Sequence, residues 1–361
     1  KARTDTGVAA YKKYGTTVMV KIVNESGAFP TKYWAAGEYD QWKEISGDAL
    51  LEKCKVKAKA CPRCFMACGN LSEVVHGRHA GLKLEGPEYE TIYAFGGLCM
   101  IDSIEEIIYL NDMCDQLGID TITAGNLAAF AVVASEKGVI DERIGFGDVD
   151  AIAELLKKIA ARRGIGTTLS EGIVHASKEW GMAEEAVHVK GLEPAGYDPR
   201  VLKGMGLAYA VSDRGACHLR STFYKPELAG MIEPDQIKGK AEMFIDFEDR
   251  LTLFDTMVFC RFFRDLIQWD ELATVVRATT GMDLDQAGLK GIAANVTDAA
   301  RIFNLREGMA AEQDSLPEPF FTEKLPPSGK SISREDLHMM VQDYYRLRGW
   351  DKQGIPASYK A

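Results

Sequence analysis

Helical periodicity dominates this sequence and limits the chain to a mainly helical fold. Apolar residues recur at helical spacing in several long segments, each bounded by Gly, Pro or a capping Ser, Thr or Asp. Between Ile101 and Leu117 the apolar side chains fall near one face, Gly118 follows as a stop, and Asp120 can cap the next helix. The other segments predicted as helices are 148–163, 168–180, 247–267, 270–280, 285–309 and 333–348.

Strand-like segments are few and short, and the best candidates are 18–23 and 187–189. Loops rich in Gly and Pro occupy 191–199 and 316–329, and the first of them marks a domain boundary. A chain of 361 residues is long enough for two domains. We therefore predict a mainly α protein with two helical domains, 1–194 and 195–361.

The charge balance excludes two classes of partner. The formal net charge of −10 and the pI near 5.3 argue against binding to nucleic acid or to an anionic membrane surface. No apolar run approaches the roughly 20 residues that a membrane helix needs. Eight cysteines are too few for a disulfide scaffold and point to a reducing compartment. The sequence therefore predicts a cytoplasmic protein with no nucleic-acid or membrane partner.

The strongest chemical signal is a C-x2-C-x3-C run formed by Cys61, Cys64 and Cys68. Thiolates at this spacing can converge on three corners of a [4Fe–4S] cluster, and the fourth iron needs a distant thiolate. Cys260 is the predicted fourth ligand, because it lies in a predicted helix between apolar residues that would shield a cluster from water. A structural zinc site and simple buried thiols are the alternatives.

Two further segments carry titratable groups. The acidic segment 85–91 contains Glu90 next to a tyrosine, and a buried carboxylate there could move protons; the alternative is a solvated acidic turn. In the segment 213–220, His218 can exchange protons near neutral pH, and Arg220 can hold an anionic group such as a phosphate. A purely structural histidine is the alternative for His218.

Five motifs together resemble the tungsten-containing aldehyde:ferredoxin oxidoreductases. They occur in the order of that family and cover essentially the whole chain. The resemblance implies two helical domains that flank a cofactor site holding a tungsten bis-pterin and one [4Fe–4S] cluster. The motifs are the cysteine run, the Gly-Pro-Glu-Tyr-Glu segment at 86–90, the stretch 117–125, the Ala-Cys-His-Leu-Arg motif at 216–220 and the closing Arg-Gly-Trp-Asp at 348–351.

The resemblance also implies residue roles. The family binds its two pterins with two Asp-x-x-Gly-Leu-(Asp/Cys) motifs. The first corresponds here to Asp115 through Asp120, with Ile in place of Leu, and the second to Asp255 through Cys260, with Val258 in place of Gly and Phe in place of Leu. Carboxylates at helix ends can accept hydrogen bonds from pterin N–H groups, although Asp120 would cap a helix in any case.

By the same resemblance, Cys61, Cys64, Cys68 and Cys260 hold the cluster, while Glu90 and His218 lie beside the metal and manage protons. The implied reaction converts an aldehyde and water into a carboxylic acid, two protons and two electrons. The electrons pass to ferredoxin or another electron-transfer subunit.

Two other functions remain open. A branch of the family reduces aromatic acyl-CoA esters and ligates tungsten with a cysteine, for which Cys99 is the candidate; a buried thiol is the alternative. The chain could instead be a non-catalytic iron–sulfur electron-transfer protein.

Contacts with partners are predicted from two segments. The four lysines in 53–59 could guide an acidic ferredoxin, with a solvated face as the alternative. His76 and His79 could touch substrate or a second metal, or lie in a surface loop. The resemblance makes a homodimer or a larger complex plausible. It also implies that the β-rich first domain of the family is missing, so we expect a fragment of a longer polypeptide.

Overall fold

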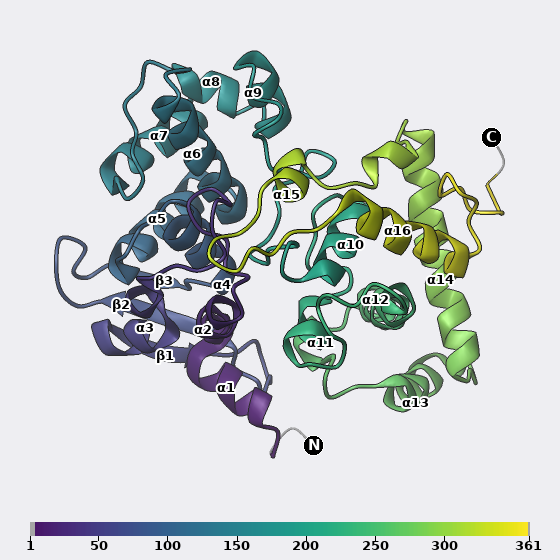
Figure 1. Cartoon of the computed structure of the whole chain (residues 1–361). Coiled ribbons are helices and arrows are strands. Elements are labelled where there is room, and N and C mark those ends of the chain that lie inside the picture. The colour runs from purple at the N-terminus through teal and green to yellow at the C-terminus, as the bar shows by residue number, and fades with distance from the viewer. Residues whose placement is uncertain (1–3, 360–361) are drawn as a thin grey trace. The chain divides into compact units, whose positions relative to one another are not determined.

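The computed structural model describes residues 4–359, which form two compact units (Figure 1). The first unit comprises the described residues up to Val201 together with 317–331, and the second comprises 202–316 with the described residues from Ile332. The predicted division at 194/195 falls in the loop just before Val201. The chain is mainly α, as predicted.

The first unit combines helices with one small sheet. Its strands β1 (Cys54–Lys59), β2 (Gly69–Val74) and β3 (Lys83–Glu85) pair antiparallel in the order β1-β2-β3. A π-helix at Tyr93–Leu98 continues directly from α4. The helices are α1 (Thr6–Tyr14), α2 (Val18–Glu25), α3 (Gly47–Lys53), α4 (Tyr89–Ile92), α5 (Ile104–Leu117), α6 (Thr121–Glu136), α7 (Val149–Ala161), α8 (Ile165–Leu169), α9 (Ile173–Glu179) and α15 (Glu318–Thr322).

Helix α6 forms the centre of the first unit. It is apolar on all sides and nearly every residue from Ala124 to Ala134 is buried, as expected for a helix surrounded by others. Gly125 lets α6 approach the chain at Ala94, because a Cβ at that position would lie 2.6 Å from Ala94. The close approach brings the N-terminus of α6, where Asp120 is the cap, next to α4 and the π-helix.

In the second unit α12 (Lys240–Thr256) lies in the middle, with α10 (Lys203–Val211), α14 (Gln286–Arg306) and α16 (Arg334–Arg348) packed against it (Figure 1). Helices α11 (Tyr224–Leu228) and α13 (Trp269–Thr280) complete the unit. One core cluster joins α12, α13 and α14 through Leu251, Leu253, Phe254, Leu272, Val276, Leu289 and Ala293.

Several sequence predictions of local structure were wrong. Residues 18–23 are helical, because Met19, Val20 and Val23 pack on one side of α2, and this packing outweighs the β-branched run. Residues 187–189 form only an isolated bridge between Val189 and Leu192. The predicted helix 168–180 is two short helices separated by Gly172, which has a φ of +88°.

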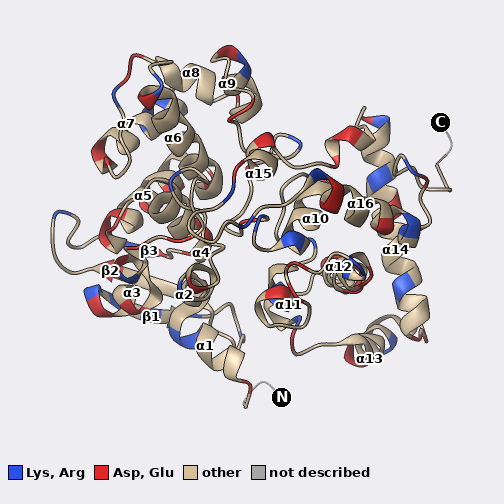
Figure 2. Cartoon of the chain, in the orientation of Figure 1, with Lys and Arg blue, Asp and Glu red and all other residues tan. Residues whose placement is uncertain are grey.

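The charged residues are mixed in sign. Figure 2 shows Lys and Arg beside Asp and Glu on helices of both units, so the negative net charge is not gathered in one block. Among residues 4–359, no single helix is both long and apolar enough to cross a membrane.

Candidate functional site

The three clustered cysteines lie on the loop that joins β1 to β2. The ladder between these strands ends at the pair Lys59 and Gly69, so residues 60–68 form the tip of a hairpin. Cys61 is exposed, and Cys64 and Cys68 are half-buried. The Cys64 N–H donates to the Cys61 carbonyl at 3.0 Å, which folds the loop back on itself.

Three thiols on one exposed hairpin loop match the donor chemistry of an iron–sulfur cluster, since such clusters are held by cysteine thiolates. Within the described part of the chain, no group of three or more His, Cys, Asp or Glu side chains is already arranged around a possible metal position. The loop therefore supplies the donors without a preformed coordination geometry.

Cys260 is not in a helix, contrary to the prediction. Helix α12 ends at Thr256, and Cys260 is an exposed residue in the loop that follows. The helix ends because Val258 takes the left-handed conformation with a φ of +57°, which reverses the chain. Phe254 and Phe259 pack edge to face below this turn, and Cys260 is left accessible.

The two segments predicted to bind pterin have the same backbone fold. In the first, the Ile119 N–H donates to the Cys114 carbonyl at 3.0 Å and Gly118 is left-handed with a φ of +70°. In the second, the Phe259 N–H donates to the Phe254 carbonyl at 2.7 Å and Val258 is left-handed. Both are Schellman-type helix ends, in which a left-handed residue satisfies the last carbonyls.

The residues that follow these two helix ends, Asp120 and Cys260, also have similar backbone angles. Asp120 has φ −62° and ψ 133° and caps α6, while Cys260 has φ −68° and ψ 128° and precedes the short 3-10 helix Arg261–Phe263. Asp115 and Asp255 are both exposed; Asp115 accepts a hydrogen bond from Asn111, and Asp255 is paired with Arg220 and Arg261. The Gly-to-Val difference at Val258 has therefore not changed the shape of the motif, and each unit carries one copy.

Arg220 and Asp255 line a cavity of about 300 Å³ in the second unit. The Arg220 guanidinium donates to Asp213 at 2.8 Å and to Asp255 at 3.3 Å. The buried hydroxyls of Ser221 and Thr222 have no hydrogen-bond partner among the described residues. Glu248 also lines this cavity, so an anionic group that binds Arg220 would have to compete with the carboxylates around it.

His218 is half-buried on the same segment as Arg220. Burial lowers the pKa of His218 to about 3, and repulsion by neighbouring guanidinium groups lowers it further. These groups belong to Arg214, Arg261 and Arg264. At neutral pH His218 is therefore a neutral imidazole that can accept or donate a hydrogen bond.

Glu90 lies at the start of α4 in the first unit, and its Oε2 accepts the N–H of Gly196 at 2.9 Å. Burial raises the pKa of Glu90 to about 8, and the charges of Asp120 and Glu88 add to the effect. Tyr89 and Tyr93 flank it and donate to the carbonyls of Gly196 and Pro194. Glu90 is therefore held in place by the loop that carries Gly196, whereas Glu85 and Glu88 of the same segment are exposed.

Cys99 is completely buried at the end of the π-helix, and its thiol donates to the Gly125 carbonyl at 3.4 Å. Burial raises the pKa of this thiol far above its ordinary value. These surroundings favour a neutral thiol and give no support to metal ligation by Cys99.

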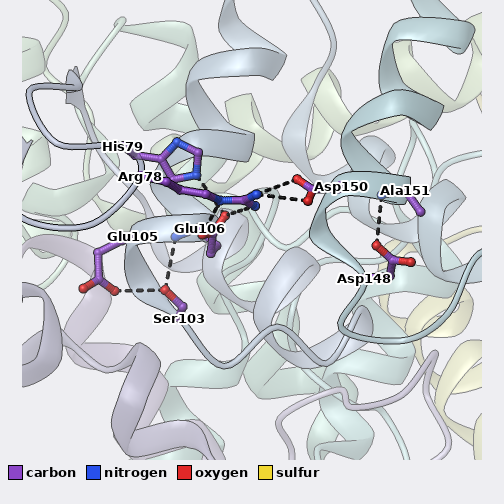
Figure 3. Close-up of polar contacts among 8 residues, drawn as sticks. All are labelled: Arg78, His79, Ser103, Glu105, Glu106, Asp148, Asp150 and Ala151. Atoms are coloured by element: carbon purple, nitrogen blue, oxygen red, sulfur yellow. Dashed lines mark hydrogen bonds and ion pairs between the residues drawn. The ribbon is translucent and has the colours of Figure 1, made fainter.

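The loop between β2 and β3, which carries His79, is held by a polar cluster (Figure 3). Arg78 bridges Glu106 on α5 and Asp150 on α7, with contacts of 2.7 Å to each. His79 lies 2.9 Å from Glu106 and stacks on Tyr109 with ring centres 4.2 Å apart. These contacts give His79 a structural role in anchoring the loop between β2 and β3.

A sequence profile described as "Aldehyde ferredoxin oxidoreductase, domains 2 & 3" matches residues 1–361. The chain belongs to the aldehyde ferredoxin oxidoreductase family. A tungsten-containing aldehyde ferredoxin oxidoreductase of Pyrococcus furiosus is 35% identical over 354 residues, which cover 95% of this chain and 58% of that protein. Its counterpart in Thermococcus kodakarensis is 33% identical over 354 residues, with the same coverage. The chain thus spans a little over half the length of the curated relatives it matches.

A solved structure has the same fold. The active site complex BamBC of benzoyl coenzyme A reductase, in complex with 1,5-dienoyl-CoA, superposes with a TM-score of 0.73 at 16% identity. The match covers 96% of this chain and 58% of that one. The match shows that this chain shares its mainly helical fold with that structure.

Sequence reasoning missed three polar residues of these sites. Asp213 holds Arg220, and Arg261 pairs with Asp255. Glu193 is only 4% exposed in the first unit. Asp213 and Arg261 lie within or next to family motifs, so their position in the sequence could have marked them as candidate site residues. Glu193 lies in a Gly- and Pro-rich loop that reads as a linker, and nothing in its spacing marks it.

Proposed function

We propose that this chain functions in a tungstopterin- and [4Fe–4S]-dependent oxidoreductase that oxidises aldehydes to carboxylic acids and passes the electrons to ferredoxin. The observation that carries the proposal is the pair of matching helix ends, one at Asp115–Asp120 and one at Asp255–Cys260. A cofactor with two similar halves would need two such sites.

In this proposal Asp115 and Asp120 hold one pterin and Asp255 holds the other, through carboxylate oxygens that are exposed at helix ends. Arg220 holds an anionic group of the cofactor from the wall of the cavity. Cys61, Cys64, Cys68 and Cys260 would hold the cluster. Tungstopterin, when bound, would accept the two electrons of the oxidation.

Glu90 is the proposed proton acceptor. A carboxyl group with a pKa of about 8 exchanges its proton near neutral pH, which suits a general base or acid. The Gly196 N–H keeps its carboxylate in one orientation. His218 is neutral and can orient a carbonyl or a water molecule by a hydrogen bond.

The outer face of the sheet is the proposed docking site for ferredoxin. Lys57 projects from β1 beside the cysteine loop and has no ion pair among the described residues, and Leu71, its register partner, is 42% exposed. The other three lysines of the run are ion-paired, Lys53 with Glu44, Lys55 with Glu73 and Lys59 with Glu85. Changing Lys57 to Glu should slow reduction of ferredoxin and leave reduction of a neutral dye unchanged; equal loss in both assays would contradict the docking site.

The proposed reaction is tested with native protein purified without oxygen. Aldehyde-dependent reduction of a viologen dye, lost in Glu90→Gln and retained in the exposed control Glu25→Gln, is the expected result. The same assay with an aromatic acyl-CoA ester and a reduced dye tests the acyl-CoA reductase alternative. Turnover of the ester without turnover of any aldehyde would replace the proposed reaction by that alternative.

A further inference from the structure

Glu193 is a buried acid in the first unit that no motif marks. Its side chain is 4% exposed, and its Oε2 accepts a hydrogen bond from the Thr123 hydroxyl at 3.1 Å. Thr123 lies in the first turn of α6, and its backbone N–H donates to Asp120 at 2.9 Å. One threonine therefore connects Glu193 with Asp120, the proposed pterin ligand.

The loop that carries Glu193 also touches Glu90. The Gly196 N–H donates to Glu90, and Tyr93 donates to the Pro194 carbonyl. Tyr93 in turn accepts a hydrogen bond from Asn126 of α6 at 3.0 Å. A Cβ at Gly196 would lie 2.6 Å from the Tyr93 ring, so the loop fits closely against its neighbours. Glu193 and Glu90 are thus held by the same four-residue loop.

The surroundings of Glu193 disfavour its charge. Burial raises the pKa of Glu193 to about 7, and the charge of Asp120 adds to this, while the Thr123 hydrogen bond favours the ionised form. The other titratable groups that face Glu193 are Tyr93 and Tyr33, and both are buried phenols whose pKa is raised. A proton on Glu193 relieves its repulsion with Asp120.

We propose that Glu193 is a second proton-holding residue of the Glu90 site, coupled to it through Thr123, Asp120 and the 193–196 loop. This inference rests on the proposed function. Oxidation of an aldehyde with water releases two protons and two electrons. Glu90 takes up one of these protons and returns it to solvent, the other proton goes to solvent, and the two electrons leave one at a time to two molecules of ferredoxin. Glu193 keeps its own proton beside Asp120 and so sets the charge around Glu90. Glu193 acts through its neighbours and is a positioning residue.

Infrared difference spectroscopy across a pH series tests whether the Glu193 carboxyl group carries a proton. Among the protonated-carboxyl bands of the native protein, one should disappear near pH 7 and another near pH 8. Glu193→Gln should remove the first band. Thr123→Val keeps the carboxyl group but removes the hydrogen bond that favours its charge, so it should move that band to higher pH. A spectrum that is unchanged in Glu193→Gln would overturn the inference, whatever the activity.

The pH profile of turnover tests the coupling. The charge of Asp120 contributes to the raised pKa of both Glu193 and Glu90. Glu193→Gln removes one of the negative charges gathered around Asp120, so the acidic limb of the kcat profile should shift to lower pH, with KM for the aldehyde unchanged. A uniform loss of kcat at every pH would indicate a merely structural role and would overturn the coupling. Two carboxyl bands in a protein without aldehyde activity would instead refute the proposed reaction and support the proton on Glu193.

Discussion

Replacing Val258 by asparagine should stabilise the second unit. Val258 is left-handed with a φ of +57°, a conformation that disfavours residues with a Cβ by about 1–2 kcal/mol and β-branched residues most. Its side chain is 90% exposed, so its removal leaves no cavity. Asparagine tolerates this conformation well, and the free energy of unfolding should rise by about 1 kcal/mol. Val258→Gly should raise the free energy of unfolding by less, because glycine gives the unfolded chain more conformational entropy.

The corresponding helix end in the first unit allows the opposite substitution, from glycine to valine. Gly118 occupies the same left-handed position, and a Cβ built there meets no atom within 4 Å. Gly118→Val should therefore destabilise the first unit by about 1–2 kcal/mol through backbone strain alone. Val139→Asn, at an exposed valine without a left-handed backbone, is the control and should change little.

Urea denaturation followed by far-ultraviolet circular dichroism measures these differences. Tryptophan fluorescence assigns them to a unit, because Trp269 and Trp350 lie in the second unit and Trp34, Trp42 and Trp180 in the first. If Val258→Asn proves neutral or destabilising while Gly118→Val is harmless, the two helix ends do not share the strained geometry described above.

Three further outcomes are expected. Because the pKa of Glu90 is raised in the folded chain, Glu90 destabilises the fold increasingly as pH rises toward about 8. At pH 8 the Glu90→Gln variant should therefore be more stable than the native chain by roughly 2–3 kcal/mol, after allowance for partial exposure. Thermal unfolding across a pH series measures this difference. Arg78→Ala should lower the free energy of unfolding by about 1 kcal/mol, and high salt should reduce the difference. Lys240→Met leaves Glu227 buried without its partner and should lower stability by about 3–5 kcal/mol, whereas replacing both residues with methionine should restore much of it.

The helices were the most predictable part of the fold. Segments with strong periodicity and a capping residue, such as α5 with Gly118 and α16 with Ser333, lie where the pattern placed them. The sheet was missed because β1 alternates lysines with small residues and lacks the apolar, β-branched composition of a typical strand. The predicted helix 247–267 was wrong at both ends, because α12 runs from Lys240 to Thr256. Its end was missed because the left-handed residue there is a valine and not a glycine.

Motifs marked several candidate site residues in the sequence, and their roles stay predictions. The cysteine loop, Glu90 and the pair Arg220 and Asp255 were all identified from sequence spacing or resemblance, and the structure places the last two on one cavity. Charge networks between distant segments were not predictable. Glu193 meets Thr123 only because the 193–196 loop folds against α6, and no local pattern encodes that contact.

Metal analysis of native protein purified without oxygen, with tungsten, molybdenum, iron and zinc quantified per chain, tests the proposed cofactors directly. The proposed function predicts about four irons and about one tungsten, with the iron lost when Cys61 and Cys64 are changed to serine. Zinc in place of iron, or iron without tungsten or molybdenum, would contradict it.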